Sequence, residues 1–103
     1  MMEHYSDKEL VRIILKGNQS AYADLIDRHK VFVFNLSLRM LKQRELAEEV
    51  AQDVFIKVYR KLNTYKGDSK FSSWLYSIAY RTCLDQIKKE KRHLGVQTLE
   101  EKH

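Results

Sequence analysis

The sequence predicts an all-α fold, a compact bundle of three longer helices plus a short N-terminal helix. The 103 residues include no proline and only three glycines, so few positions can form the tight turns of a β fold. Apolar residues recur with a helical period over most of the chain. A chain of this length is the size of one domain and can bury a core without disulfides.

A first, short helix is expected from Asp7 to Lys16. Ser6 and Glu9 have the spacing of a capping box, in which the serine hydroxyl accepts a backbone N–H and the glutamate reaches back to the cap. Apolar residues follow at helical spacing, and Gly17 comes where a left-handed residue typically ends a helix. These signals define both ends of the helix.

The second helix is expected to begin after Ser20, whose side chain suits an N-cap, and to continue to Leu41. Its apolar positions keep the helical period over almost the whole segment. His29 lies on the apolar side and is interpreted as a core histidine. The connection at Gln43 and Arg44 is short, so the second and third helices should be antiparallel neighbours.

The third helix is expected from about Glu45 to Asn63, with a nearly continuous apolar stripe that predicts a buried face. The opposite face is acidic, because residues 45–54 contain four acidic residues and no basic one. Ile56 lies at the edge of that face as an apolar residue that the stripe does not need, which is typical of an anchor for a partner helix. A solvated surface explains the charges equally well.

Residues 64–70 interrupt the helical pattern with a glycine and polar residues, and a loop is expected there. The fourth helix is expected from Phe71 to about Arg92, with its apolar stripe in the core. Residues 94–103 show no sustained pattern. We interpret them as the start of a linker that follows a domain of residues 1–93.

The charge distribution favours an anionic partner. The formal net charge is +5, and the segment from Lys57 to Arg92 holds ten basic and three acidic residues, a net charge of +7. Six of the eleven aromatic residues lie between Tyr59 and Tyr80, within this segment. Cations that contact phosphates and rings that stack on unpaired bases are typical of single-strand nucleic-acid binding. Each ring alone is also a common core residue, but the cluster as a whole favours binding.

Other classes of function lack support in the sequence. The single cysteine, Cys83, cannot form an internal disulfide, and the four histidines show no zinc-ligand spacing. No apolar run approaches the ~20 residues of a membrane span. No nucleophile and base converge, and no glycine-rich phosphate loop is present. We therefore expect a cytoplasmic protein that is not an enzyme, needs no metal or cofactor, and does not insert into membranes.

Two segments resemble a known family, the second conserved region of bacterial sigma factors, and in particular the extracytoplasmic-function (ECF) group. The segment from Ala47 to Phe55 reads AEEVAQDVF and resembles the helix with which that family binds core RNA polymerase. The segment from Phe71 to Ala79 reads FSSWLYSIA and resembles its promoter-melting helix. Both occur in the family's order and separation, and the likeness extends over residues 6–92.

The resemblance implies a transcription initiation factor domain that binds core RNA polymerase, through the clamp coiled coil of the largest subunit, and recognises and melts the promoter minus-ten element. The residues expected to bind the polymerase are Glu48, Glu49, Gln52, Asp53 and Ile56. The residues expected to bind promoter DNA, chiefly the non-template single strand, are Asn63, Tyr65, Lys66, Gly67, Asp68, Lys70, Phe71, Ser73, Trp74, Tyr76, Ser77, Tyr80, Arg81, Lys88 and Lys89. An anti-sigma factor is a further implied partner.

Within that set, the loop at residues 63–70 matches the family's segment that captures a flipped base. Trp74 matches an aromatic residue at the upstream edge of the melted bubble. Family members often carry asparagine where this chain has Arg81, so the base preference there is open. A complete factor of this group continues through a linker into a helix-turn-helix domain, and we interpret this chain as the isolated second-region domain.

Two other classes of function stay open. One is a helical protein-interaction adaptor without a DNA role, which would use the acidic face and Ile56. The other is a helix-turn-helix domain that binds duplex DNA, which is disfavoured because no short helix pair with a tight turn precedes a basic helix. A preference for single-stranded over double-stranded DNA would separate the second class from the sigma-factor interpretation.

Overall fold

The computed structural model describes residues 4–102, with the side chains of residues 4–93, and it confirms the predicted all-α bundle. Four α-helices follow one another: α1 (Asp7–Leu15), α2 (Ala21–Leu41), α3 (Arg44–Lys61) and α4 (Phe71–Lys102), with a 3₁₀ turn, η1 (Leu62–Thr64), after α3. No strand occurs within the described range. None of the helices in this range is long and apolar enough to cross a membrane.

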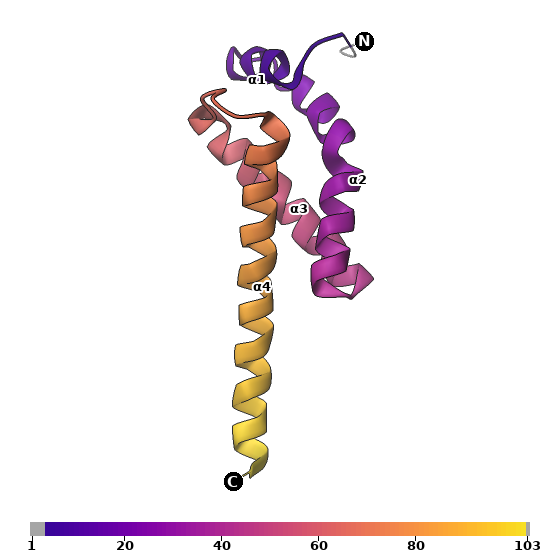
Figure 1. The fold of residues 1–103 in the computed structure, drawn as a ribbon, viewed down its shortest axis with the longest axis vertical. Coiled ribbons are helices and arrows are strands. Elements are labelled where there is room, and N and C mark those ends of the chain that lie inside the picture. Colours follow the sequence, from indigo (N-terminus) through magenta and orange to yellow (C-terminus); the bar gives the residue numbers. More distant parts are fainter. Residues whose placement is uncertain (1–3, 103) are drawn as a thin grey trace.

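The helices α2, α3 and α4 pack against one another, and α1 lies across one end of them (Figure 1). The chain reverses between α2 and α3 through Lys42, which adopts a left-handed conformation with φ 62°, so these helices are antiparallel neighbours as predicted. The loop after η1 lies at the same end as α1. The second half of α4 continues beyond the other helices.

The core is built from the apolar stripes that the sequence predicted. On α3, Val50, Val54 and Val58 are buried, and the charged residues lie on the opposite, exposed face of the helix. On α4, Leu75 and Ala79 are fully buried. Burial of these stripes is the main favourable term of folding, because most of the stability of a helix in a protein comes from the packing of its apolar face.

Both ends of α1 form as the sequence predicted. The Ser6 hydroxyl accepts the backbone N–H of Glu9 at 3.1 Å, and the Glu9 carboxylate accepts the backbone N–H of Ser6 at 3.1 Å. At the other end, Gly17 has φ +116°, and the amides of Gly17 and Asn18 bond to the carbonyls of Ile14 and Ile13. This is a Schellman motif, which needs a residue of positive φ at the glycine position.

Acidification is expected to remove the contribution of the capping box to stability. Hydrogen bonds from the backbone and then the side chain of Ser6 hold the pKa of Glu9 below its ordinary value of 4.5. A carboxyl group whose pKa folding depresses stabilises the fold above the unfolded pKa and loses that effect as the pH falls through the folded pKa. The melting-temperature gap between the unmodified chain and Glu9→Ala should therefore shrink at a pH well below 4.5, as measured by circular dichroism. A gap independent of pH would contradict this.

Three local expectations were wrong. Ser20 does not cap α2: its backbone is helical, and its hydroxyl donates to the Asn18 side chain at 2.6 Å instead. The third helix ends at Lys61 rather than Asn63, because the chain tightens into η1. The fourth helix does not end near Arg92 but continues to Lys102. No proline interrupts it, and a single glycine, Gly95, costs a helix only about 1 kcal/mol.

Candidate functional site

The outer face of α3 carries all five residues predicted to bind a protein partner. Glu48, Glu49, Gln52, Asp53 and Ile56 are exposed, while the opposite face of the helix packs in the core. Ile56 is 50% exposed, an unusual state for a large aliphatic side chain. The face is therefore pre-formed and acidic, with an apolar anchor at its edge.

An apolar groove of about 600 Å³ adjoins this face, between α2 and α3. Its walls include Tyr22 and Ile26 of α2 together with Phe55, Ile56 and Tyr59 of α3. The Tyr22 hydroxyl donates to the Phe55 carbonyl, and the Tyr22 and Tyr59 ring centroids are 5.0 Å apart. Burial, followed by the proximity of Tyr59, raises the pKa of Tyr22 well above its ordinary value. The phenol is thus a fixed, neutral donor that holds the two helices together.

Sequence reasoning did not assign Tyr22 and Ile26 to any surface. Both fit the apolar period of α2, and that period indicates burial without showing which residues lie at the edge of the core. Their proximity to the exposed Ile56 would have identified them, but that contact is visible only in the tertiary structure.

The aromatic residues of the loop and α4 divide into two groups. The first is a packed cluster: Tyr65 and Phe71 are buried, and Trp74 is half-buried against them, with centroid distances of 5.2 Å from Tyr65 and 5.7 Å from Phe71. The Tyr65 hydroxyl donates to the Ser69 carbonyl at 2.6 Å and so closes the loop. Burial, then the carboxylates of Asp7 and Asp68, raise the pKa of Tyr65.

Tyr65 and Phe71, two of the residues expected to bind DNA, are buried in this structure. Tyr65 is 9% exposed and Phe71 only 3% exposed, so neither offers a free ring face in this state. Their rings instead support Trp74 and the loop from beneath. The physical reason is that Phe71 follows the apolar stripe of α4, and Tyr65 folds back onto it.

The second group of rings is exposed. Tyr76 and Tyr80 are 42% and 41% exposed and stack on each other, with centroids 5.9 Å apart and an interplanar angle of 18°. Phe32 of α2 extends the series, at 6.1 Å from Tyr76. These rings present apolar faces to the outside of the bundle.

The polar residues predicted in the loop and along α4 are exposed. The loop backbone turns through Gly67, which has φ +81° and is half-buried. The Ser77 hydroxyl donates to the Trp74 carbonyl at 2.7 Å, within the helix. The exposed members of the predicted set are Asn63, Lys66, Asp68, Lys70, Ser73, Ser77, Arg81, Lys88 and Lys89.

A groove of about 810 Å³ with a basic wall lies along α3 and α4. Its lining includes four residues that the sequence predicted, Tyr76, Ser77, Tyr80 and Arg81. The sequence did not predict the other polar residues of the lining, which are Lys57, Arg60, Lys61, Thr82 and Asp85. The Lys57 ammonium donates to the Thr82 hydroxyl at 3.4 Å, which orders it at the groove wall. The charge count of the segment was the available signal for the residues on α3.

Two of the predicted residues lie far along α4 from the loop. Lys88 and Lys89 are exposed on α4, roughly 27 Å along the helix from Lys70. They cannot contact the same nucleotide as the loop.

The site offers no residues arranged for metal binding or for thiol chemistry within the described range. No group of three or more histidine, cysteine, aspartate or glutamate side chains there could hold a metal ion. Cys83 is buried and donates to the Ser37 hydroxyl at 3.6 Å. Burial raises the pKa of its thiol, so the reactive thiolate is disfavoured.

Comparison with solved structures gives a close match. An NMR structure of the complex formed by an engineered region 2 of sigmaE with GTAAAA superimposes with a TM-score of 0.80 at 35% identity. The match covers 91% of this chain and 98% of the other. The fold described above is therefore that of a sigma-factor second region.

Comparison with curated sequences leads to the same group. The ECF RNA polymerase sigma factor SigW of Bacillus subtilis is 38% identical over 84 residues, or 82% of this chain. The RNA polymerase sigma-H factor of Pseudomonas aeruginosa is 33% identical over 87 residues, and the ECF RNA polymerase sigma-E factor of Escherichia coli is 37% identical over 87 residues, each match covering 84% of this chain. In all three comparisons the match covers 45% of the relative's length.

The family comparison delimits the matching region. The family model of Sigma-70 region 2 matches residues 25–93, which include most of α2, all of α3, the loop and the part of α4 whose side chains are described. Together with the identities to the ECF relatives, this match shows that the chain belongs to the sigma-70 region 2 family, in its ECF group.

Proposed function

We propose that this chain is the part of an ECF sigma factor that binds core RNA polymerase and that recognises and melts the promoter minus-ten element. The observation that carries the proposal is that one rigid bundle presents two separate exposed surfaces of different chemistry. One is the acidic outer face of α3, and the other is the loop with the basic groove along α4. Two such surfaces suit a protein that connects a protein partner to DNA.

The acidic face supports the polymerase contact. Glu49, Gln52 and Asp53 lie within about one helical turn, so a basic or polar helix of a partner can reach all three at once. Ile56 and the groove beside it provide an apolar anchor, which commonly contributes most of the binding energy of an interface. We propose the clamp coiled coil of the largest polymerase subunit as that partner.

The loop and α4 support the DNA contact. Lys66 and Lys70 are exposed where they can contact phosphates, and Trp74 keeps part of its ring accessible. Tyr76 and Tyr80 add exposed rings at the basic groove. Unpaired bases stack on such rings, whereas bases in a duplex are already stacked on each other, so this surface favours a single strand. The relative of known structure was solved with GTAAAA, which supports the same kind of ligand here.

Several finer points belong to the same proposal. A protein that joins RNA polymerase acts in the cytoplasm and initiates transcription without catalysing a reaction of its own. An anti-sigma factor is a further expected partner. The proposed domain boundary after residue 93 coincides with the end of the family match.

The polymerase contact is tested by reversing charge on α3. Asp53→Lys combined with Gln52→Ala is expected to weaken binding to core polymerase at least tenfold, because a cation replaces an anion at the contact. Both side chains are exposed, so the melting temperature should stay near that of the unmodified chain. Binding is measured by pull-down with core polymerase and stability by circular dichroism.

A matched control is available on α2. Asp27→Lys makes the same charge change at an exposed carboxylate of α2 that lies outside the predicted face. It should bind the polymerase as the unmodified chain does. Unchanged binding by the double variant would contradict the assignment of the α3 face.

A helical adaptor without a DNA role is the second candidate, and the apolar groove between α2 and α3 is the observation that favours it. An adaptor needs a docking groove but no cations around the loop. Replacement of Lys66 and Lys70 by alanine would leave an adaptor fully active, whereas it should lower the affinity of a sigma factor for single-stranded DNA.

A further inference from the structure

The first helix, α1, packs on the loop that is proposed to capture a base. A Cβ atom placed on Gly67 would lie 3.9 Å from both Cδ and Cε of Lys8, so the aliphatic part of the lysine passes directly over the loop glycine. In the same region α1 also contacts η1, the turn that leads into the loop. Residues 7–15 lie outside the family match, and none of them belongs to the residues proposed above to bind DNA.

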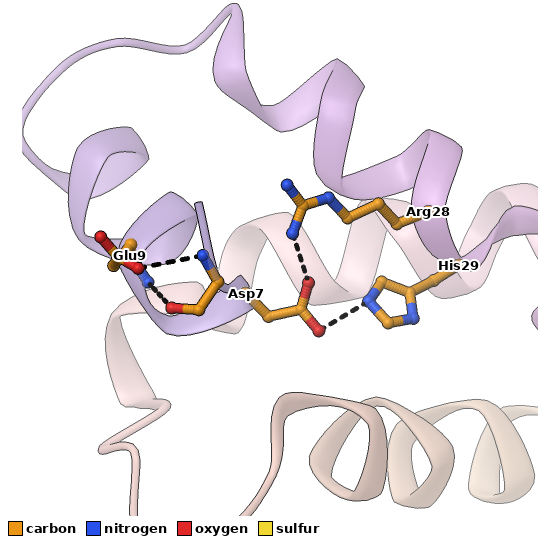
Figure 2. A network of polar contacts seen from close by, with 5 residues as sticks. Asp7, Glu9, Arg28 and His29 are labelled. Carbon is orange, nitrogen blue, oxygen red and sulfur yellow. Dashed lines mark hydrogen bonds and ion pairs between the residues drawn. The ribbon is translucent and has the colours of Figure 1, made fainter. Parts of the chain in front are cut away.

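A second set of contacts fixes α1 in this position (Figure 2). The Asp7 carboxylate accepts a hydrogen bond from Arg28 at 3.3 Å and lies 3.0 Å from His29 Nε2. The His29 ring packs on Phe71, with centroids 5.3 Å apart, and Phe71 packs edge-on against Tyr65. Tyr65 in turn closes the loop through its hydroxyl. The start of α1 is therefore connected through His29 to Phe71 and Tyr65, the rings on which the loop packs.

The charge of Lys8 is left available by this arrangement. The nearest carboxylates along the chain are engaged elsewhere, since Asp7 pairs with Arg28 and His29 and Glu9 accepts the backbone N–H of Ser6. Lys8 is exposed, and no ion pair involves it within the described range. The Cδ and Cε atoms of its stem lie beside Gly67, which places the ammonium group next to the loop.

We propose that Lys8 binds a backbone phosphate of the single strand that occupies the loop. The inference rests on the proposed function and extends the nucleic-acid surface from the loop and α4 to α1. Together with Lys66 and Lys70, it places three exposed ammonium groups around one loop, whose own carboxylate is that of Asp68; the nearby Asp7 carboxylate is paired with Arg28 and His29. A single-stranded polyanion is the ligand that such a set of unpaired cations fits.

The test separates the charge of Lys8 from its packing. Lys8→Gln removes the charge and keeps only the first two methylenes of the stem, whereas Lys8→Arg keeps the charge on a stem long enough to reach Gly67. Lys16→Gln is the matched control, because Lys16 is an exposed lysine at the opposite end of α1. All variants are made in the full 103-residue chain.

Binding is measured by fluorescence anisotropy with labelled GTAAAA and with a random single-stranded hexamer, over a range of salt concentrations. Lys8→Gln is expected to lower affinity about three- to tenfold at low salt, as the loss of one charged contact does. The slope of log affinity against log salt should become shallower by about 0.7, the value for one phosphate of a single strand. Lys8→Arg should retain both affinity and slope, and Lys16→Gln should match the unmodified chain.

The outcomes distinguish the role of Lys8 from the proposed DNA-binding function. If the unmodified chain binds the strands but Lys8→Gln keeps its affinity and slope, Lys8 only packs on the loop, and the proposed function stands without this inference. If Lys16→Gln weakens binding as much as Lys8→Gln, the effect is one of net charge and the inference is overturned. If the unmodified chain binds neither strand, the proposed DNA contact is contradicted and the role of Lys8 falls with it.

Discussion

Replacing Trp74 with alanine is expected to reduce promoter opening by ~1–3 kcal/mol, a factor of about 5 to 150, because one ring that stacks on an unpaired base is lost. The structure adds a second reason for a large effect. Trp74 packs on Tyr65 and Phe71, so its removal also loosens the support of the loop. Opening is measured as permanganate reactivity of thymines in the bubble, with core polymerase and a matched promoter.

The loss of the ring must be separated from loss of stability. Val33→Ala is the control, because Val33 is fully buried in α2 and its truncation weakens the fold without touching the loop cluster. At a temperature where both variants are folded, Val33→Ala should open the promoter normally and Trp74→Ala should not. Thymine reactivity of Trp74→Ala at the level of the unmodified chain would show that the tryptophan is only a core residue.

Replacing Leu75 with alanine is expected to lower the free energy of unfolding by about 2–5 kcal/mol. Leu75 is fully buried and is among the largest of the fully buried side chains, so its truncation leaves a cavity where α4 packs on the core. The free energy of unfolding of a small domain is only about 5–15 kcal/mol, so the expected loss is a large fraction of the total stability. Urea denaturation followed by circular dichroism measures the change.

Ser72→Ala is the matched control for Leu75→Ala. Ser72 lies on the same helix, three residues away, and is exposed. Its replacement should change stability by no more than about 0.5 kcal/mol. Equal effects of the two substitutions would mean that the buried face of α4 is assigned wrongly.

The helices and their buried faces were predictable because their signals are local. The capping box at Ser6 and the glycine at position 17 are short patterns, and both form as expected. The stripe on α3 could be recognised from its period alone, and so could the acidic face opposite it. The likeness to the sigma-70 region 2 family, first indicated by two short segments, was confirmed by the family match.

Predictions at the ends of helices were less accurate. The prediction that Ser20 caps α2 was wrong because an N-cap needs a non-helical backbone at that residue, and the residue type alone does not determine the backbone conformation. The predicted end of α4 was wrong because loss of the apolar pattern does not by itself end a helix, and this segment contains no proline to break it.

The sequence by itself determined the helices, their core faces and the separation of acidic from basic segments, since each depends on residues a few positions apart in the chain. Only the tertiary structure decided which rings are buried, because Tyr65 folds back onto Phe71 while Tyr76 meets Phe32 of another helix. It also decided that Lys8 lies over Gly67. Such contacts depend on how helices cross and rotate against one another, and helical periodicity carries no information about that rotation.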